Sequence, residues 1–442
     1  MAKEKILILG AGLVGSLLSI FLAKKGFKVK VFEKRPDPRK NDVLGGRSIN
    51  LALSDRGLLA LEKAGVTKNL DKVMLPMHGR MIHQLDSQVH FQPYGKANQA
   101  INSVSRGLLN EYLIGEAEGA GASFRFGHKC EQADIDDSVL SFSTGGKTKE
   151  YRGDVIIGAD GAYSVLRASF LRSDRFNFSQ DYLPHGYKEL NIPAGKNGEF
   201  QIDPNALHIW PRGKFMLIAL PNIDKSFTCT LFLPFEGASS FDALNTPEKV
   251  GAFFSEVFPD TLPVIPNLTD QFFTNPTSSL VTIQCYPWGK KRSLLLGDAS
   301  HAIVPFFGQG MNAGFEDCRI LDEIIDAEYP NWETVFQSFE KERKPNTDAI
   351  AKLANDNFIE MRDKVADAGF IWQKKLEARI HEKYPDKWTP LYTMVTFSNM
   401  PYSKALERGN RQESIMRKIR EVYPMSTPPE AIDLEKIVGW LD

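Results

Sequence analysis

The sequence predicts an α/β fold in which a unit of parallel strands and helices is interrupted by an antiparallel sheet. The first 33 residues read as strand, helix and strand: KILIL, an apolar-periodic stretch around 13–25, and KVKVF. Short apolar runs at 154–158 and 293–298 are typical of strands buried in a parallel sheet. Between them, residues 181–285 hold alternating β-rich runs separated by turn residues, as in antiparallel hairpins.

The remaining chain fits around these two units. We expect helices at 50–65 and 107–120, strands between about 74 and 104, and a further helix from about 311. After residue 331 the pattern is mostly helical to about 385 and mixed beyond it. The predicted domains are a discontinuous first unit of 1–70, 98–180 and 286–330, a β-sheet unit of 71–97 and 181–285, and a mostly helical C-terminal unit of 331–442.

The composition is that of an ordinary globular protein with a large core. The 442 residues carry 54 Lys and Arg against 55 Asp and Glu, a net charge of −1, so the basic surface typical of nucleic-acid-binding proteins is not expected. The four cysteines form no Cys-x-x-Cys pair, and we expect neither a metal site nor disulfides. Glycines interrupt the apolar stretch 6–23, and no other run approaches the ~20 residues of a membrane span, so we expect a cytoplasmic protein without a membrane anchor.

A glycine-rich turn joins the first strand to the first helix. Gly10 permits the tight turn, Gly12 lets the backbone approach a pyrophosphate, and Gly15 lets helix and strand pack closely. Glu33 ends the next strand, where its carboxylate can accept hydrogen bonds from both hydroxyls of an adenosine ribose and would repel a 2′-phosphate. The motif therefore predicts FAD or NAD at this site, and does not distinguish the two.

Two later segments resemble motifs of the flavoprotein aromatic hydroxylases. Residues 158–167 (GADGAYSVLR) resemble their D-G motif, and residues 297–312 resemble their G-D motif. The resemblance implies bound FAD and a Rossmann-like FAD-binding fold of the aromatic-hydroxylase type, with an inserted substrate-binding sheet and a C-terminal helical segment. The flavin contacts that it implies are Arg106, Asp160, Asp298, Gly308, Gly310, Met311 and Asn312. Taken alone, Asp160 also fits a turn residue and Asp298 a helix N-cap.

Further blocks of sequence resemble the kynurenine 3-monooxygenase family within that group. They are 47–54 (RSINLALS), 185–190 (HGYKEL), 205–211 (NALHIWP) and 392–398 (YTMVTFS), and they extend over almost the whole chain. The resemblance implies L-kynurenine as the small-molecule substrate, with Arg80 and Tyr94 binding its carboxylate. Residues toward the C-terminus, namely Asn357, Met361 and Tyr392, would help to hold the substrate.

The same resemblance implies an apolar wall around the substrate ring. Alternate residues on predicted strands would supply it, although they also fit ordinary sheet core: Leu207, Ile209, Met216, Ile218, Leu220 and Phe232. Phe306 would complete the wall, and Pro305 and Phe306 would lie at the catalytic centre. Phe307 occupies a position that varies in the family, and no histidine is present there to assist the reaction.

The reaction implied by the resemblance is hydroxylation of L-kynurenine at the ring 3-position, through a flavin C4a-hydroperoxide formed with NADPH and O₂. NADPH would bind transiently, since the chain has one dinucleotide fingerprint. Two alternatives remain: a phenol or salicylate hydroxylase of the same fold, and a flavin-binding regulatory protein without hydroxylase activity. The sequence leaves open the role of loop 39–46, the NADPH site, and the oligomeric state, a homodimer included.

Overall fold

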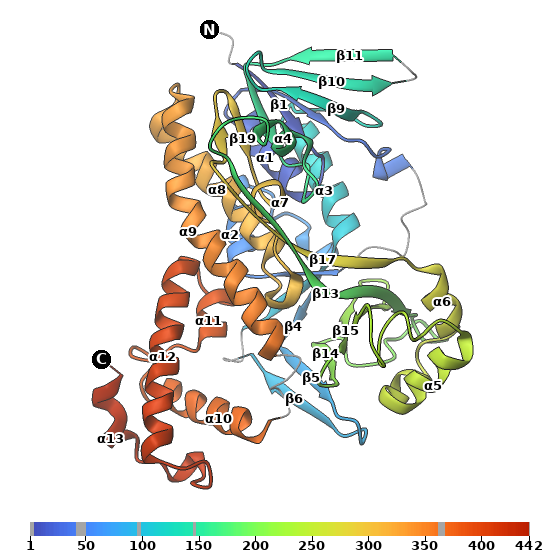
Figure 1. Ribbon diagram of the computed structural model, residues 1–442, viewed down its shortest axis with the longest axis vertical. Coiled ribbons are helices and arrows are strands. Elements are labelled where there is room, and N and C mark those ends of the chain that lie inside the picture. Colours follow the sequence, from blue (N-terminus) through green and yellow to red (C-terminus); the bar gives the residue numbers. More distant parts are fainter. Residues whose placement is uncertain (1–3, 41–49, 95–98, 145–146, 361–366, 442) are drawn as a thin grey trace.

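The computed structural model describes residues 4–40, 50–94, 99–144, 147–360 and 367–441. A six-stranded, mostly parallel sheet occupies the upper part of the molecule in Figure 1, and its strand order is β18-β19-β12-β1-β2-β8. Its strands are β1 (Lys5–Leu9), β2 (Lys28–Phe32), β8 (Ser123–Arg125), β12 (Val155–Gly158), β18 (Gly289–Lys290) and β19 (Ser293–Leu295). The central strand β1 lies parallel to both β2 and β12, and helices cover the sheet, as predicted for the first unit.

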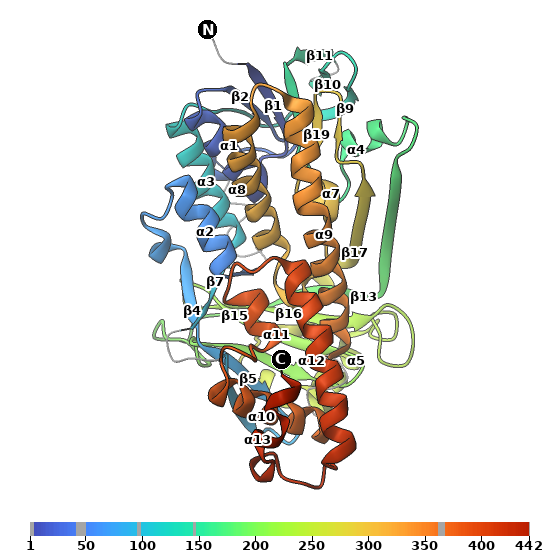
Figure 2. The ribbon, with the colours of Figure 1, turned by 90° about the vertical axis from the view of Figure 1, so that its left-hand side faces the viewer.

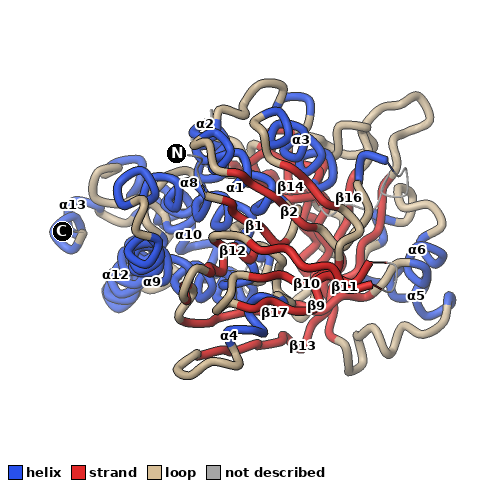
Figure 3. Tube along the Cα trace, turned by 90° about the horizontal axis from the view of Figure 1, so that it is seen from above, coloured by secondary structure: helices blue, strands red, loops and turns tan. Residues whose placement is uncertain are grey.

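Helices from several parts of the chain cover this sheet, and Figure 3 shows strands between helices. They are α1 (Leu13–Lys24), α2 (Asp55–Ala64), α3 (Arg106–Gly119), α4 (Val165–Phe170), α7 (Asp298–His301) and α8 (Gly310–Glu328). Strand β1 and helix α1 are almost entirely buried, because apolar residues fill both the strand and the helix that follows it. This packing brings the N-terminal glycine turn beside β12 and β19.

A seven-stranded sheet forms the second layer, in the order β17-β13-β16-β15-β14-β5-β6. Its strands are β5 (Gly79–His83), β6 (Val89–Pro93), β13 (Asn177–Ile192), β14 (Ala206–Pro211), β15 (Met216–Pro221), β16 (Phe227–Pro234) and β17 (Thr277–Tyr286). Every pairing in it is antiparallel except that of β5 with β14. The long strands β13 and β17 run side by side from the first unit into this sheet (Figures 1 and 2). Helices α5 (Pro247–Val257) and α6 (Leu268–Thr274) lie at its outer end.

Two small sheets complete the β structure. One contains β3 (Asn50–Leu53), β7 (Ile101–Ser105) and β4 (Met74–Met77), and the other contains β9 (Lys129–Asp134), β10 (Val139–Thr144) and β11 (Lys147–Arg152). The predicted helix over 50–65 is therefore wrong at its start: residues 50–53 pair with β7, and the helix begins after Ser54. The predicted domain boundaries stay a prediction. Strand β4 lies in the segment 71–97, which was assigned to the β-sheet unit, but it pairs with β7, which lies in the segment 98–180 of the first unit.

The regular elements of the C-terminal part are all helices within its described residues, including those beyond 385, where the sequence pattern is mixed. Its helices are α9 (Trp332–Ile359), α10 (Ala368–Lys383), α11 (Leu391–Thr396), α12 (Tyr402–Val422) and α13 (Leu434–Ile437). Helix α9 runs along the molecule beside α8, and α12 packs against α9 (Figure 2). Within the described residues, no helix combines the length and the apolar character that crossing a bilayer requires.

Candidate active site

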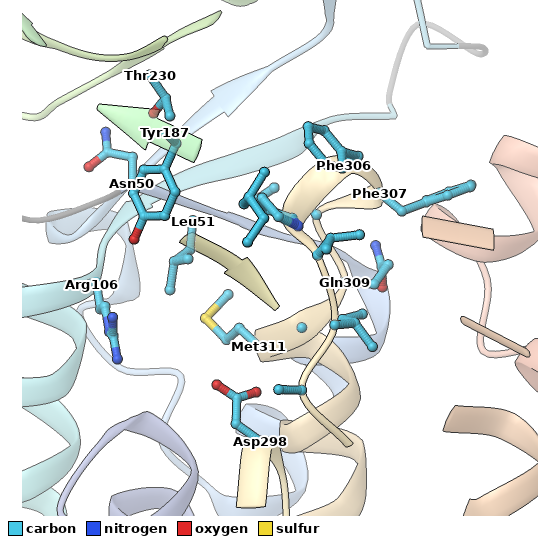
Figure 4. Close-up of a pocket in the computed structure, with 18 of the residues that line it drawn as sticks. Asn50, Leu51, Arg106, Tyr187, Thr230, Asp298, Phe306, Phe307, Gln309 and Met311 are labelled. Carbon is cyan, nitrogen blue, oxygen red and sulfur yellow. The ribbon is translucent and has the colours of Figure 1, made fainter. Parts of the chain in front are cut away.

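A cavity of about 410 Å³ lies between the two large sheets and the segment that joins α7 to α8. This volume is in the range of small-molecule sites. Figure 4 shows Asn50, Tyr187 and Thr230 on one side of it, Phe306 and Phe307 on another, and Asp298 and Met311 farther down. The cavity is therefore bounded by residues that are far apart in the sequence.

The glycine turn has the geometry that its sequence predicts. Gly10 has φ +95°, and a Cβ there would lie 2.3 Å from the carbonyl oxygen of Ala159, so only glycine fits. A Cβ on Gly15 would lie 2.0 Å from the carbonyl oxygen of Gly10. A Cβ on Gly12 would meet nothing within 4 Å, and Gly12 lines the cavity. Gly10 and Gly15 shape the turn, and Gly12 is the glycine whose backbone a phosphate can approach.

Glu33 lies directly behind this turn, just after β2. Its Oε2 accepts a hydrogen bond from the backbone N–H of Ala11 at 3.0 Å, and its Oε1 accepts one from the N–H of Arg35 at 2.9 Å. The carboxylate is therefore fixed beside the glycine turn, although it does not line the cavity. A carboxylate can still accept further hydrogen bonds through its remaining lone pairs, as binding of a ribose requires.

Asp298 and Arg106 both line the cavity, from the first residues of α7 and α3. Burial raises the pKa of Asp298, and the positive charge of Arg106 opposes this effect. Although the surrounding protein desolvates it, the Asp298 side chain is exposed toward the cavity, where the hydroxyls of a bound polyol could donate to it. Asp298 is not the helix N-cap that the sequence also allowed, because Gly297 holds that position and Asp298 is the first residue of α7.

Asp160 caps the helix that follows it. Its Oδ2 accepts hydrogen bonds from the N–H groups of Val165 at 2.7 Å and Leu166 at 3.4 Å, and burial raises its pKa. Arg167, on that helix, donates to the carbonyl oxygens of Ala162 and Ala299. The D-G segment is thereby tied to α7, with Gly161 and Ala162 lining the cavity. Asp160 itself does not line the cavity, and a direct flavin contact stays a prediction.

The G-D segment continues as a short 3₁₀ helix, η5 (Pro305–Phe307), and then enters α8. Gly308 has φ +65°, and Gly308, Gly310 and Met311 line the cavity together with Pro305 and Phe306. The free N–H groups at the start of α8 therefore face the cavity, where they favour negative charge. Asn312 does not line the cavity.

Asn312 instead fastens this segment to β3. Its Nδ2 donates to the carbonyl oxygens of Ala52 and Gly308, both at 2.8 Å, and its Oδ1 accepts from the N–H of Ser54 at 3.0 Å. The predicted flavin contact of Asn312 stays untested, whereas its structural contacts are evident.

At another end of the cavity, Arg80 lies among aromatic rings. Its guanidinium carbon is 4.4 Å from the ring centroid of Tyr392 and 5.8 Å from that of Tyr94, and the two tyrosine rings stack at 5.6 Å. Phe307 stacks on the other side of Tyr392 at 5.5 Å. The hydroxyl of Tyr94 and the Nε of Arg80 are buried with no hydrogen-bond partner among the described residues. A buried donor without an acceptor lowers the stability of the fold. Such donors are expected where a bound ligand supplies the acceptor.

The seven-stranded sheet supplies an apolar wall to the cavity. Alternate residues face it, as the strand period predicts: Leu207 on β14, Met216, Ile218 and Leu220 on β15, and Thr230 and Phe232 on β16. Phe306 closes this wall, 5.0 Å from Phe232 between ring centroids. Ile209 is buried in the same apolar cluster but does not line the cavity.

Asn357, on α9, lies behind the cavity. Its Nδ2 donates to the carbonyl oxygen of Phe306 at 2.6 Å, and the next residue, Phe358, stacks on the Phe306 ring at 4.2 Å. Asn357 does not line the cavity, so the predicted contact with substrate stays a prediction. Met361 and most of loop 39–46 lie outside the described residues.

Several cavity-lining residues were not predicted. Asn50, Leu51 and Ala52 come from β3, and Tyr187 comes from β13. Asn50 and Tyr187 lie in the segments 47–54 and 185–190, which carry the family resemblance. Neither the polarity of their side chains nor the periodicity of the sequence indicated that they would line the cavity. Thr230 could have been found, because it shares a strand face with Phe232.

These residues together fit a bound FAD. The open position at Gly12, the carboxylate of Asp298 and the α8 N-terminus face one cavity, and each matches a different part of a flavin dinucleotide. A bound FAD accounts for all three features, whereas the glycine turn alone would also fit NAD.

Comparisons with known proteins agree with the geometry. The FAD binding domain family matches residues 3–354. A kynurenine 3-monooxygenase of Flavobacterium psychrophilum is 49% identical over 444 residues, covering 100% of this chain and 99% of the relative. The same enzyme of Christiangramia forsetii is 48% identical over 440 residues, covering 99% and 98%. The chain belongs to the kynurenine 3-monooxygenase family.

Membership of this family makes the protein a flavin-dependent monooxygenase, as its motifs predict. The fold agrees as well. A tetrameric form of 2-methyl-3-hydroxypyridine-5-carboxylic acid oxygenase superimposes with a TM-score of 0.67, over 84% of this chain and 96% of that one, at 20% identity. At 20% identity this similarity supports the fold alone, and the function is inferred from the residues of the cavity and from the family.

Proposed function

We propose that this protein hydroxylates L-kynurenine at the ring 3-position, using FAD, NADPH and O₂. The observation that carries the proposal is Arg80 beside Tyr94 and Tyr392 at one end of the cavity, next to its apolar wall. The relatives from Flavobacterium psychrophilum and Christiangramia forsetii are named kynurenine 3-monooxygenase.

Arg80 is suited to bind the substrate carboxylate. Burial alone would lower its pKa, but the tyrosine hydroxyls nearby raise it, so the guanidinium stays charged. Its planar fork can donate two parallel hydrogen bonds to a carboxylate, and Tyr94 can donate a third from its unpaired hydroxyl. Asn357 and Tyr392 complete this end of the cavity in the proposal.

The apolar wall would hold the aniline ring and exclude water. Met216, Ile218 and Phe232 offer no hydrogen bond, so a flat ring fits there and water does not. The bound flavin supplies the electron and oxygen-transfer chemistry, and the amino group of the substrate activates its own ortho carbon. The protein therefore needs no strong base at the reacting ring carbon.

Residues of the first unit would hold the cofactor. In the proposal Gly12 faces the pyrophosphate, Glu33 accepts from the adenosine ribose, and Asp298 and Arg106 contact the ribityl chain and phosphate. The N–H groups at the start of α8, near Met311, donate to the flavin pyrimidine ring. Pro305 and Phe306 lie against its reacting edge.

The test is to purify the protein, record its flavin spectrum and follow NADPH consumption with and without L-kynurenine. Product analysis should find 3-hydroxykynurenine, and NADH should be run in parallel. Consumption stimulated by salicylate or phenol but not by L-kynurenine would favour the related hydroxylase. Bound flavin with no stimulated consumption by any of these compounds would favour a regulatory protein.

A further inference from the structure

The segment Pro305–Gly310 lines the cavity, and side chains of the C-terminal helices contact it from the other side. Gln309 immediately precedes α8 and is 1% exposed. In Figure 4 its side chain lies on the opposite side of its own segment from Leu51 and Met311. Its Oε1 accepts a hydrogen bond from the hydroxyl of Tyr402 at 2.8 Å, with the hydroxyl of Ser54 3.5 Å away.

Tyr402 is itself fixed in place. It is the first residue of α12 and is completely buried, and the guanidinium carbon of Arg56 lies 3.9 Å from its ring centroid. Arg56 also donates to the carbonyl oxygen of Met400 at 2.6 Å and pairs with Glu316. A donor held this firmly orients the acceptor that it binds.

The same buried network extends to the other flavin-facing segment. Arg343 donates to Glu316 at 2.5 Å and to Asp317 at 2.7 Å. Asp317 accepts from the N–H of Gly297 at 3.1 Å, directly before Asp298. Arg319 also pairs with Glu316 at 3.6 Å, and His301 lies 2.5 Å from Asp317. The two buried carboxylates are thus paired on several sides and connect α9 to both cavity segments.

We propose that Tyr402 is a positioning residue for the flavin: by holding Gln309, it fixes the N-terminus of α8 against the pyrimidine ring. The proposal uses membership of the flavin-dependent family and does not depend on the substrate. Tyr402 does not line the cavity, so its effect on a bound flavin would pass through Gln309. The C-terminal helices then contribute to flavin binding, although they lie outside the dinucleotide-binding unit.

The experiment is a double-mutant cycle on FAD affinity, measured by titrating apoprotein with FAD in the absence of substrate. Tyr402→Phe removes the nearer donor to Gln309 Oε1 and leaves only the Ser54 hydroxyl at 3.5 Å, and we expect affinity to fall about three- to tenfold. Gln309→Met should have a similar effect. The double variant should lose no more than the worse single variant, because both partners are then apolar.

A matched control is Tyr112→Phe. The Tyr112 hydroxyl donates to the carbonyl oxygen of Lys68 at 2.8 Å, and Tyr112 does not line the cavity. We expect its FAD affinity to stay within about twofold of wild type. The flavin absorption bands should shift in Tyr402→Phe and Gln309→Met and remain unchanged in the control.

Additive losses in the double variant would overturn the proposal, and so would a lower melting temperature in Tyr402→Phe with unchanged FAD affinity and spectrum. If Tyr402→Phe does not fold, Gln309→Met decides the matter alone. Unchanged FAD affinity in Gln309→Met would also overturn the proposal.

Discussion

The guanidinium carbon of Arg80 lies 4.4 Å from the ring centroid of Tyr392, so a strand of the seven-stranded sheet and the short helix α11 meet at one end of the cavity. Such stacking stabilises the cation and leaves the N–H groups at the edge of the guanidinium plane free to donate. This contact joins two parts of the chain that the sequence connects only through family resemblance.

Replacing Arg80 should raise the KM for L-kynurenine. Lys supplies charge without the planar fork, and Ala supplies neither, so Arg80→Ala should lose about ten- to a hundredfold in apparent affinity and Arg80→Lys less. The stimulation of NADPH consumption by substrate should weaken in both variants. Steady-state kinetics of the purified variants measure both effects.

A kynurenine analogue without the carboxylate is the control for this prediction. It should bind wild type poorly and distinguish little between wild type and Arg80→Ala, because the partner of Arg80 is already missing. If Arg80 served only to hold the structure together, the variants would change in stability and keep a wild-type KM for L-kynurenine. That result would remove Arg80 from the substrate site.

Glu33→Ala should weaken FAD retention while the fold is kept. The variant loses the acceptor for the ribose hydroxyls and the bond to the Ala11 N–H, and a charged hydrogen bond contributes about 1.5–3 kcal/mol. The protein should therefore purify with less flavin and bind added FAD about ten- to a hundredfold more weakly. Circular dichroism checks the fold, and a full flavin content with unchanged affinity would show that Glu33 does not bind the cofactor.

Phe306→Ala should uncouple NADPH consumption from hydroxylation. Removing the ring opens space between Phe232 and Phe358, beside the place proposed for the reacting flavin edge, and admits water. Flavin should remain bound, while hydrogen peroxide accounts for the NADPH that yields no product. Phe306→Leu fills more of the space and should couple better than Phe306→Ala, whereas equal coupling in all three proteins would make Phe306 simple core.

A buried pair of histidines lies on the far side of β5 and β14 from the cavity. His83 Nδ1 is 2.8 Å from Asp260 Oδ2, His83 Nε2 is 2.8 Å from His208 Nδ1, and His208 Nε2 is 2.8 Å from the carbonyl oxygen of Asp203. Burial lowers the pKa of His208 to about 4, from an ordinary value of 6.5. His208 is then neutral and donates from Nε2, and its Nδ1 accepts from His83.

The stability of the protein should accordingly fall as the pH drops from about 6.5 to about 4, because the unfolded chain binds a proton at His208 that the folded chain does not. The fully developed effect is about 3 kcal/mol at pH 4 relative to neutral pH. His208→Gln keeps a side-chain donor and does not titrate, so its unfolding free energy should depend less on pH in this range. His90→Gln, at an exposed position of β6, should retain the wild-type dependence, and equal pH dependence in all three proteins would contradict the prediction.

The sequence predicts well those features that short-range geometry dictates. Gly10 must adopt φ +95° and Gly15 must admit a neighbouring carbonyl, so both could be recognised from spacing alone. Residues 50–53 were missed as a strand because their apolar pattern continues into α2, and only pairing with β7 separates the two. The partners of Arg56 and His83 could not be predicted, because each lies on a remote part of the chain.

The same remoteness governs how the protein can be made. Leu9 pairs with Gly158 of β12, and Gly158 pairs with Leu295 of β19, so strand β12 acquires its second neighbour only late in synthesis. A ribosome that has released half the chain presents an unfinished sheet with an open edge, which invites pairing with other chains. Chains that stop before Ser293 should be degraded quickly by added protease, and those extended through α8 should resist it. The glycine turn within the first fifteen residues is therefore among the first parts to be translated. The sheet that supports it is among the last parts to be completed.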